Sequence, residues 1–414
     1  MDITIIKKQI INIIKNIDDM ISDNFGSIKI LFVIKNSISF KVFLPIIRET
    51  IHDNHFKIYL TLECNGCFTF PEDKESQFLK YSHYINTKKA LFSKWHFIFF
   101  SDFSSLYFFR HATTISIPHG YAYGNSHKES NKNNDTSMYS LKTINANNIS
   151  LAFLSSNNII EKISVDKTYL VTGSPQSDIF THKIKPREKY HTLNRYKLNN
   201  KNKNIVIYSH WKENSLLNTI DIYQLEQLVK SFPIYNFIIN GHILLWKNHD
   251  GSVRINPLFL KLTNLDKTHN NLLFLPFLKN SYDISKIADY FIGDNSSYFV
   301  EACLVDKPIF YYDHPGFIFE DSQVETLFKK ACTPFSSFDA LLSIMTDLKD
   351  FSDSQKNDRK NVIDFFLFKP GYSTNYIIKF LKTIGRNSGP KSRNWDKVTN
   401  YCKMEAKFLT EKEK

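Results

Sequence analysis

The sequence predicts an α/β protein with two parallel sheets, each covered by helices. Short apolar, β-branched or aromatic runs recur along the whole chain, and amphipathic segments such as residues 218–232 separate them. This alternation is typical of parallel sheets whose strands are joined by helical crossovers. The length of 414 residues is sufficient for two domains with separate cores.

The predicted strands form two groups, separated by a polar tract at residues 181–204 that is rich in Lys, Asn and Arg. They cover residues 29–34, 56–63, 95–100, 114–120, 151–156 and 168–175 in the first group, and 204–211, 236–242, 271–277, 289–294 and 308–313 in the second. We therefore expect one domain over residues 1–190, a second over 200–385, and a basic tail or surface helix over 386–414.

The composition narrows the classes of function. Hydrophobic residues at 42% and aromatic residues at 15% indicate a folded protein, and 12 glycines leave no glycine-rich phosphate loop. Bound phosphate would therefore need hydroxyls, helix N-termini or basic groups. The net charge of +12 favours an anionic partner. Because the basic residues are scattered and no nucleic-acid motif accompanies them, we do not expect that partner to be a nucleic acid.

The cysteines and the N-terminus bear on the compartment. The 5 cysteines are too few for a disulfide framework, which indicates a reducing environment, and the CNGC segment at 64–67 has no second pair to form a zinc site. No apolar run is long enough to span a membrane. Residues 1–20 form an amphipathic helical pattern, which either packs on its own domain or lies on an anionic membrane surface. Its apolar face consists of Ile3, Ile6, Ile10, Ile13, Ile17 and Met20.

Polar residues recur at one kind of position, directly after a predicted strand. They are His119, Ser174, His210, His242, Asp294, Ser296 and Ser297. In open α/β sheets, ligands bind beyond the carboxyl ends of the strands. The shared position therefore predicts a ligand site at these sheet edges.

The most informative segment is ADYFIGDNSSYFVEACLVDKPIFYYD, residues 288–313, which predicts a strand, a polar turn, a helix and a second strand. The turn consists of Asp294, Asn295, Ser296 and Ser297. Its hydroxyls and the N–H groups of the helix N-terminus would bind the phosphates of a nucleotide-activated donor. Glu301, one turn into the helix, would accept hydrogen bonds from a ribose diol. The alternative is an ordinary helix cap.

Histidines at two strand ends are candidates for catalysis. His119 stands between Pro118 and Gly120, which would present its ring to a ligand, where it would take a proton from a hydroxyl near neutral pH. His242 would donate to a phosphate oxygen and stabilise a leaving group. For each ring the alternative is a structural role in a turn, a cap or the core.

Further substrate contacts are expected at four residues, of which Gly120 directly follows His119. His210 and Lys212 begin the second domain, where they would meet a base or a phosphate, and Ser174 lies in a small-residue turn that is either a substrate contact or an ordinary connection. No H-E-x-x-H, D-x-D or G-x-S-x-G motif occurs, so we assign no metal site and expect no required cofactor.

Several of these segments occur together, in the same order, in another family. The segments SIPHG, TGSPQSD, HWK, NGH and residues 288–313 resemble those of the CDP-glycerol glycerophosphotransferases, which build teichoic acids and capsules. The resemblance covers about residues 110–315. It implies a GT-B fold, with two Rossmann-like domains facing across a cleft, an acceptor-side base at His119 and a phosphate-contacting His242. It also implies pyrophosphate ligands at Ser296 and Ser297 and a ribose-binding acid at Glu301.

The chain departs from the family pattern at Gln176, where Arg is usual, at Asn295, where Tyr is usual, and around His242, which lacks the K-x-H-P context. These differences leave the transferred group open. The expected activity is transfer of a polyol phosphate from a CDP-alditol to a polysaccharide or lipid-linked acceptor, with release of CMP. The alternative is glycosyl transfer from CMP-Kdo or CMP-sialic acid. Both place the enzyme in the cytoplasm, peripheral at the inner face of the cell membrane.

Overall fold

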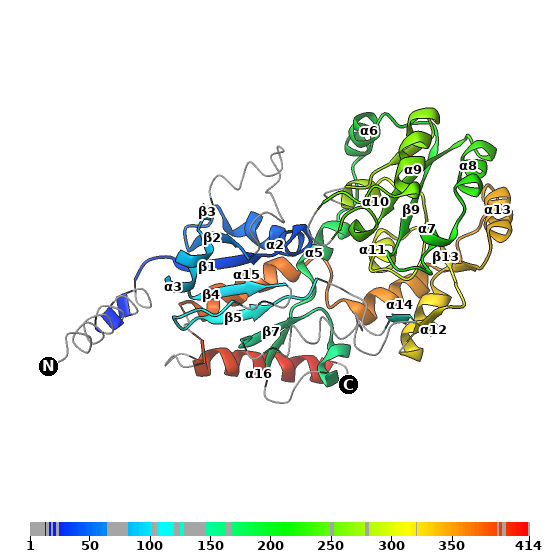
Figure 1. The fold of residues 1–414 in the computed structure, drawn as a ribbon. Coiled ribbons are helices and arrows are strands. Elements are labelled where there is room, and N and C mark those ends of the chain that lie inside the picture. Colours follow the sequence, from blue (N-terminus) through cyan, green and yellow to red (C-terminus); the bar gives the residue numbers. More distant parts are fainter. Residues whose placement is uncertain are drawn as a thin grey trace. The chain divides into compact units, whose positions relative to one another are not determined.

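The computed structural model describes two compact units, each built on one sheet (Figure 1). The first comprises Met1–His119, Tyr139–Gln176 and Tyr372–Lys414, and the second comprises Gly120–Met138 and Ser177–Gly371. The residues that the structure describes are 13, 16–17, 20–21, 25–63, 82–101, 104, 106–119, 125–127, 146, 148–162, 167–248, 252–277, 281–319, 321–386, 389–390 and 395–412.

The first unit contains a seven-stranded parallel sheet in the order β3-β2-β1-β4-β5-β7-β8. The strands are β1 (Ile28–Ile34), β2 (Phe56–Leu62), β3 (His83–Tyr84), β4 (Phe97–Phe100), β5 (Thr113–Ser116), β7 (Leu151–Leu154) and β8 (Thr168–Val171). The helices are α2 (Ser37–Thr50), α3 (Thr87–Phe92), α15 (Ser373–Ile384), α16 (Trp395–Lys412) and the 3₁₀ helix η2 (Asn157–Lys162).

Alternate residues of β1 enter two different cores, as expected for a sheet covered on both faces. Ile30 and Phe32 belong to the core that contains α2, α15 and α16, whereas Leu31 and Val33 belong to the core on the other face. All four side chains are buried, with at most 2% of their surface exposed. The near-continuous apolar run of this strand follows from that double burial.

The C-terminal helices divide the chain differently from the boundaries expected at 200–385 and 386–414. In α15, Ile377 and Phe380 are fully buried in a core of the first unit, and Val398 of α16 joins the same core. Conversely, the polar tract contains α6 (Pro186–Arg195), whose Leu193 packs in a core of the second unit. The apolar faces of these helices, and not the polar composition between the strands, determine where each one packs.

The second unit contains a six-stranded parallel sheet in the order β11-β10-β9-β12-β13-β15. The strands are β9 (Lys203–Ser209), β10 (Tyr235–Gly241), β11 (Leu272–Phe274), β12 (Tyr290–Gly293), β13 (Ile309–Tyr312) and β15 (Thr333–Phe335). The remaining helices are α5 (Pro175–Asp178), η3 (Ile179–Thr181), α7 (Leu216–Thr219), α8 (Ile222–Ser231), η4 (Ile243–Leu245), α9 (Pro257–Thr268), α10 (Tyr282–Ser285), α11 (Tyr298–Val305), α12 (Ser322–Lys330), α13 (Phe338–Asp347) and α14 (Lys356–Phe366).

The prediction of two helix-covered parallel sheets is confirmed, and every predicted strand is present. The sequence pattern missed the short strands β3 and β15. It also missed an antiparallel pair between β6 (Asn125–His127) and β14 (Phe317–Phe319). Each of these strands has two or three residues, too few to produce a recognisable periodicity.

Two sequence expectations concern surfaces. Ile13, Ile17 and Met20, of the predicted amphipathic face, are 57%, 49% and 62% exposed. No helix in the described parts of the chain has the length and apolar character needed to cross a membrane. The CNGC segment at 64–67 lies outside the described residues.

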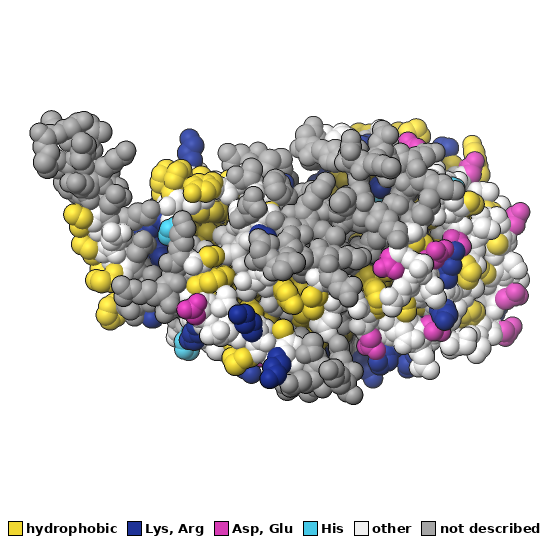
Figure 2. Space-filling view, turned by 90° about the horizontal axis from the view of Figure 1, so that it is seen from below, with side chains coloured by type: hydrophobic (Ala, Val, Ile, Leu, Met, Phe, Trp, Pro, Cys, Tyr) yellow, Lys and Arg dark blue, Asp and Glu magenta, His cyan; other side chains and the backbone are white. Residues whose placement is uncertain are grey.

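Charges of opposite sign are mixed on the face drawn in Figure 2. Ion pairs join Lys329 to Asp313 and Glu325, and Lys360 to Asp364. Exposed ion pairs of this kind each contribute little to stability.

Candidate functional site

The polar turn after β12 lies at the carboxyl edge of the second sheet, between β9 and β13. Gly293 ends the strand directly against the ring of Tyr208. A Cβ atom at this position would lie 2.2 Å from the Tyr208 ring, so a side chain larger than hydrogen would displace the strand end. The glycine therefore allows the turn to begin close to β9.

Asp294 is the structural anchor of this turn. Its carboxylate is fully buried and accepts hydrogen bonds from Ser209 Oγ at 2.7 Å, and from the backbone N–H groups of His210 and Leu216, each at 2.8 Å. Burial raises the pKa of Asp294 to about 6, against the lowering effect of these hydrogen bonds. The geometry thus gives Asp294 a supporting position under the loop that carries His210, and its predicted contact with a donor stays a prediction.

The two serines of the turn have different environments. Ser296 is 5% exposed, and its Oγ accepts a hydrogen bond from Tyr298 N–H at 3.2 Å, whereas Ser297 is exposed. The N–H of Ser296 donates to the carbonyl oxygen of Asp294 at 2.8 Å. Among the described residues, the hydroxyl and N–H of Ser297 have no hydrogen-bond partner. Of the donors expected here, those of Ser297 are therefore placed best for a ligand.

Asn295 and Glu301 are both buried, each with 5% of its surface exposed. Glu301 lies in the first turn of α11, and its Oε2 accepts a hydrogen bond from Ser281 Oγ at 2.9 Å. Ser281 directly precedes α10, and nothing in its local sequence distinguished it. The bond from Ser281 thus orients the Glu301 carboxylate, and its predicted contact with a ribose stays a prediction.

His210 and His242 lie next to each other at the ends of the neighbouring strands β9 and β10. Their ring centroids are 5.7 Å apart, and the Trp211 ring is 5.6 Å from His210 and 6.4 Å from His242. The backbone N–H of His242 also donates to Ser209 O at 2.8 Å, which fixes the relative positions of the two strand ends. The structure thus brings together two histidines that are 32 positions apart in the chain.

Both rings are held in the same orientation. His210 Nδ1 accepts a hydrogen bond from Lys212 N–H at 3.3 Å, and His242 Nδ1 accepts one from Leu244 N–H at 3.2 Å. A neutral imidazole that accepts at Nδ1 carries its proton on Nε2. Both rings therefore act as Nε2–H donors, which suits contact with an anion better than removal of a proton.

A further contact links the end of β10, near His242, to the polar turn of residues 294–297, which we call the serine turn. Asn240 Nδ2, near the end of β10, donates to Tyr298 Oη at 2.9 Å, and the Tyr298 ring stacks on Tyr208 at a centroid distance of 5.6 Å. Asn240 is two residues before His242, and Tyr298 directly follows Ser297. This pair sets the spacing between the imidazole and the serine hydroxyl.

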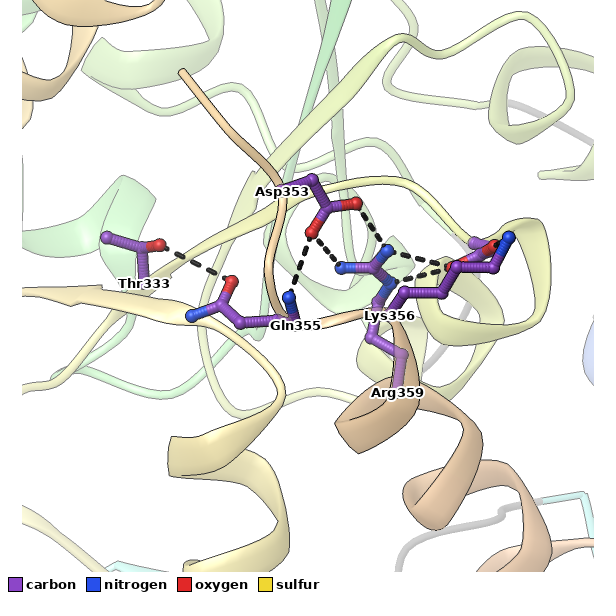
Figure 3. Close-up of polar contacts among 6 residues, drawn as sticks. Thr333, Asp353, Gln355, Lys356 and Arg359 are labelled. Carbon is purple, nitrogen blue, oxygen red and sulfur yellow. Dashed lines mark hydrogen bonds and ion pairs between the residues drawn. The ribbon is translucent and has the colours of Figure 1, made fainter.

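The far end of α11 is held by a buried arginine (Figure 3). The guanidinium of Arg359, 1% exposed, donates to Asp353 at 2.6 and 2.9 Å and to Asp306, the residue that ends α11, at 2.8 and 3.1 Å. These hydrogen bonds lower the pKa of the Asp353 carboxyl. A helix fixed at its end in this way presents its first turn, and therefore the serine turn, in a defined position.

The remaining candidates, His119 and Ser174, belong to the first unit. His119 lies three residues beyond β5, half-buried, and its backbone carbonyl oxygen accepts a hydrogen bond from Gln176 Nε2 at 2.8 Å. Gln176 therefore supports the backbone at His119. It stands at the position where Arg is usual in the family that the sequence motifs resemble. Ser174 is 3% exposed, and Gly120 lies outside the described residues.

No cluster of three or more His, Cys, Asp or Glu side chains suited to a metal ion occurs among the residues described. Lys212 is half-buried, and its carbonyl oxygen accepts a hydrogen bond from Asn218 Nδ2 at 2.8 Å. His210 and Lys212 therefore share one ordered loop.

Comparison by sequence found no matching family model and no matching curated protein. By structure, the chain is similar to the wall teichoic acid polymerase TagF, with 12% identity, a TM-score of 0.62, and coverage of 88% of this chain and 90% of that one, for a variant of TagF and for the same variant soaked with CDPG. It is also similar to S. aureus MnaA in a structure with UDP (11% identity, TM-score 0.58, covering 86% of this chain and 96% of that chain).

A UDP-N-acetylglucosamine 2-epimerase is a third structural neighbour, with 11% identity, a TM-score of 0.54, and coverage of 89% of this chain and 99% of that one. These likenesses show a shared fold. The chain accordingly has the GT-B fold predicted from its sequence, and its structural neighbours include the teichoic acid polymerase that the quoted motifs resemble.

Proposed function

We propose that this chain is a transferase that moves a polyol phosphate from a CDP-alditol, such as CDP-glycerol, to a hydroxyl of a growing surface polymer. The observation that carries the proposal is the pair of Nε2–H donors on His210 and His242, held beside the serine turn at one sheet edge. The fold shared with TagF, and the residues that resemble its family, support the same activity.

The proposed donor site uses three kinds of group on the second unit. His210 and His242 donate to oxygens of the diphosphate, and Ser297 adds a hydroxyl and an N–H at the positive end of the α11 dipole. Glu301 accepts a hydrogen bond from the ribose. Donors that are fixed before the ligand arrives lose little freedom when it binds, so they stabilise charge effectively.

The proposed chemistry is an in-line displacement at the distal phosphorus of the donor. His119 takes the proton of the acceptor hydroxyl, whose oxygen forms the new bond to phosphorus. The bond between that phosphorus and the bridging oxygen breaks, and CMP leaves with the electron pair. His210, His242 and Ser297 stabilise the negative charge that develops on CMP. As proposed, the step relies on positioning and charge stabilisation and requires no metal ion.

The acceptor is proposed to be a hydroxyl of a polysaccharide or a lipid-linked chain, at the cytoplasmic face of the membrane. Two observations support a position at an anionic surface. The net charge is +12, and the described apolar residues of the N-terminal helical pattern, Ile13, Ile17 and Met20, are exposed.

Release of CMP from CDP-glycerol, with a hydroxyl-bearing acceptor, tests this function. We expect turnover by the wild type and a loss of about 10²–10⁴-fold in kcat for His119→Ala, because a positioned general base contributes a factor of that size. CDP binding to the same variant should remain within about twofold of wild type.

The other outcomes separate the competing functions. Turnover with CMP-Kdo or CMP-sialic acid, and none with CDP-glycerol, would establish glycosyl transfer in place of polyol-phosphate transfer. Stabilisation by UDP with none by CMP or CDP would contradict both. Ligand at about 100 times its dissociation constant adds about 2.7 kcal/mol to the folded state, which a thermal-shift assay detects.

A further inference from the structure

A third histidine, His314, lies at the same edge of the second sheet, and the proposed function does not use it. It follows β13 by two residues and is half-buried. In the strand order, β13 is the neighbour of β12, which ends in the serine turn. His314 is therefore on one flank of that turn, whereas His210 and His242 are on the other.

The His314 ring is held in the same way as the other two. Gly316 N–H donates to His314 Nδ1 at 2.9 Å, again from the residue two positions later. The corresponding distances are 3.3 Å at His210 and 3.2 Å at His242. A ring that accepts at Nδ1 has its proton on Nε2. Among the residues that the structure describes, His314 Nε2 has no hydrogen-bond partner.

The surroundings of the ring limit its movement. The rings of Tyr312 and Phe317 lie at centroid distances of 5.7 and 6.0 Å from that of His314. Together with the bond to Gly316, these contacts keep the donor in place before a ligand binds.

The loop that carries His314 reaches across the end of β12. A Cβ atom on Gly316 would lie 2.4 Å from Asn214 Nδ2, so this loop contacts the one that follows β9. Because β12 separates β13 from β9 in the sheet, the contact passes over the start of the serine turn. Asn214 is four residues after His210, which brings the loops of two of the donors together.

We propose that His314 is a third anion-binding residue of this site, whose Nε2–H donates to an oxygen of the diphosphate from the β13 side. The inference rests on the proposed function for the identity of the ligand, a nucleoside diphosphate. With His314 included, the site has imidazole donors on both flanks of the serine turn. A diphosphate has oxygens on both of its phosphorus atoms, and donors on two sides would contact both.

Two substitutions separate the donor role from the role in the loop. In His314→Asn, Oδ1 takes the place of Nδ1 and still accepts from Gly316 N–H, but the donor is lost. In His314→Gln, the amide nitrogen takes the place of Nε2 and keeps the donor. Binding of inorganic pyrophosphate, CDP and cytidine to the full chain would be measured by calorimetry. His191→Asn, an exposed position on α6, serves as the matched control.

We expect His314→Asn to weaken binding of pyrophosphate and CDP about tenfold or more, since a hydrogen bond to a charged group is lost. His314→Gln should bind within about threefold of wild type, and cytidine binding should be unchanged in both. Urea unfolding of each variant would confirm an intact fold.

Equal binding of CDP by wild type and His314→Asn would overturn the inference about His314 and leave the proposed function standing. Pyrophosphate binding that depends on His314, without binding of CDP, would support the inference and overturn the cytidine donor. If the wild type bound neither ligand, both proposals would be overturned.

Discussion

The two sheet edges of this protein present polar groups in the same place, directly after parallel strands, but support them differently. At the edge of the second unit, side chains join separate elements: Asp294 bonds to the end of β9 and the loop after it, and Asn240 of β10 bonds to Tyr298 of α11. At the edge of the first unit, the described support for His119 is a bond from Gln176 to its backbone carbonyl oxygen. Side-chain hydrogen bonds therefore connect neighbouring segments at the second edge, and at the first edge a side chain holds the backbone of the loop that carries His119.

The difference matches the chemistry proposed for each edge. A diphosphate site benefits from donors that are already aimed at the anion, because their reorganisation would otherwise reduce affinity. A general base must instead meet an acceptor whose hydroxyl varies in position as a polymer grows. On the proposed function, the hydrogen bonds between these segments, which no motif contains, hold the donors of the diphosphate site in place.

The largest effect on stability is expected from loss of the Asp294 carboxylate, which tests whether hydrogen bonds of side chains hold the second edge together. Asp294→Ala would remove the acceptor of three hydrogen bonds, two of them buried, so we expect the free energy of unfolding to fall by about 3–5 kcal/mol, measured by urea denaturation. Asp221→Ala removes an exposed N-cap carboxylate of α8 and should cost only about 1 kcal/mol. Equal losses for the two variants would mean that the second edge is not cross-linked in the manner described.

The pH dependence of stability tests the burial of Asp294 at the second edge in a second way. The pKa of Asp294 is raised to about 6 in the folded protein from an ordinary 3.8, because the carboxylate is buried. Its stabilising contribution is therefore complete below about pH 4 and is lost as the pH rises through 6. Between pH 4 and 7, the stability of wild type relative to Asp294→Asn should fall by about 3 kcal/mol.

The Asn variant is the reference because carboxylates with a lowered pKa, such as Asp353, change stability in the opposite direction. For that group the stabilisation is present above its unfolded pKa and is lost as the pH falls. Taking the difference between the two proteins removes such contributions. A difference that stayed constant between pH 4 and 7 would show that Asp294 titrates like an exposed carboxyl.

The sequence was sufficient to predict the fold and the strand ends at which the candidate residues lie. Both parallel sheets followed from the alternation of apolar runs, and His210, His242 and the serine turn were predicted at strand ends from their position alone. These predictions depend on local patterns: a strand is a short apolar run, and parallel strands have their carboxyl ends at one edge.

The features that the sequence did not predict depend on contacts distant in sequence. Asp294 was predicted to bind the donor because it begins the turn, but its partners are about 80 residues earlier in the chain. His314 was overlooked because its motif, Asp313-His314-Pro315-Gly316, gives no indication that the loop crosses β12 to Asn214. The domain boundary was misplaced for the same reason, since α15 returns to the first unit after the whole second unit.

The smallest expected effect is a loss of CDP affinity when the hydrogen bond between Asn240 and Tyr298 is removed. Tyr298→Phe removes the hydroxyl that accepts from Asn240 Nδ2 and keeps the ring stacked on Tyr208. Asn240→Ala removes the donor. We expect each variant to weaken CDP binding about three- to fivefold, because the hydrogen bond is worth about 1 kcal/mol and fixes His242 relative to Ser297.

A double-mutant cycle then decides whether the two residues act through each other. If they do, the double variant should bind CDP no more weakly than the worse single variant, with a coupling energy of about 1 kcal/mol. Additive losses would mean that each side chain contributes separately, and that the distance between the imidazole and the serine hydroxyl is set by the strands alone. In that case the groups of the second edge would be placed by the backbone instead of by bonds between side chains.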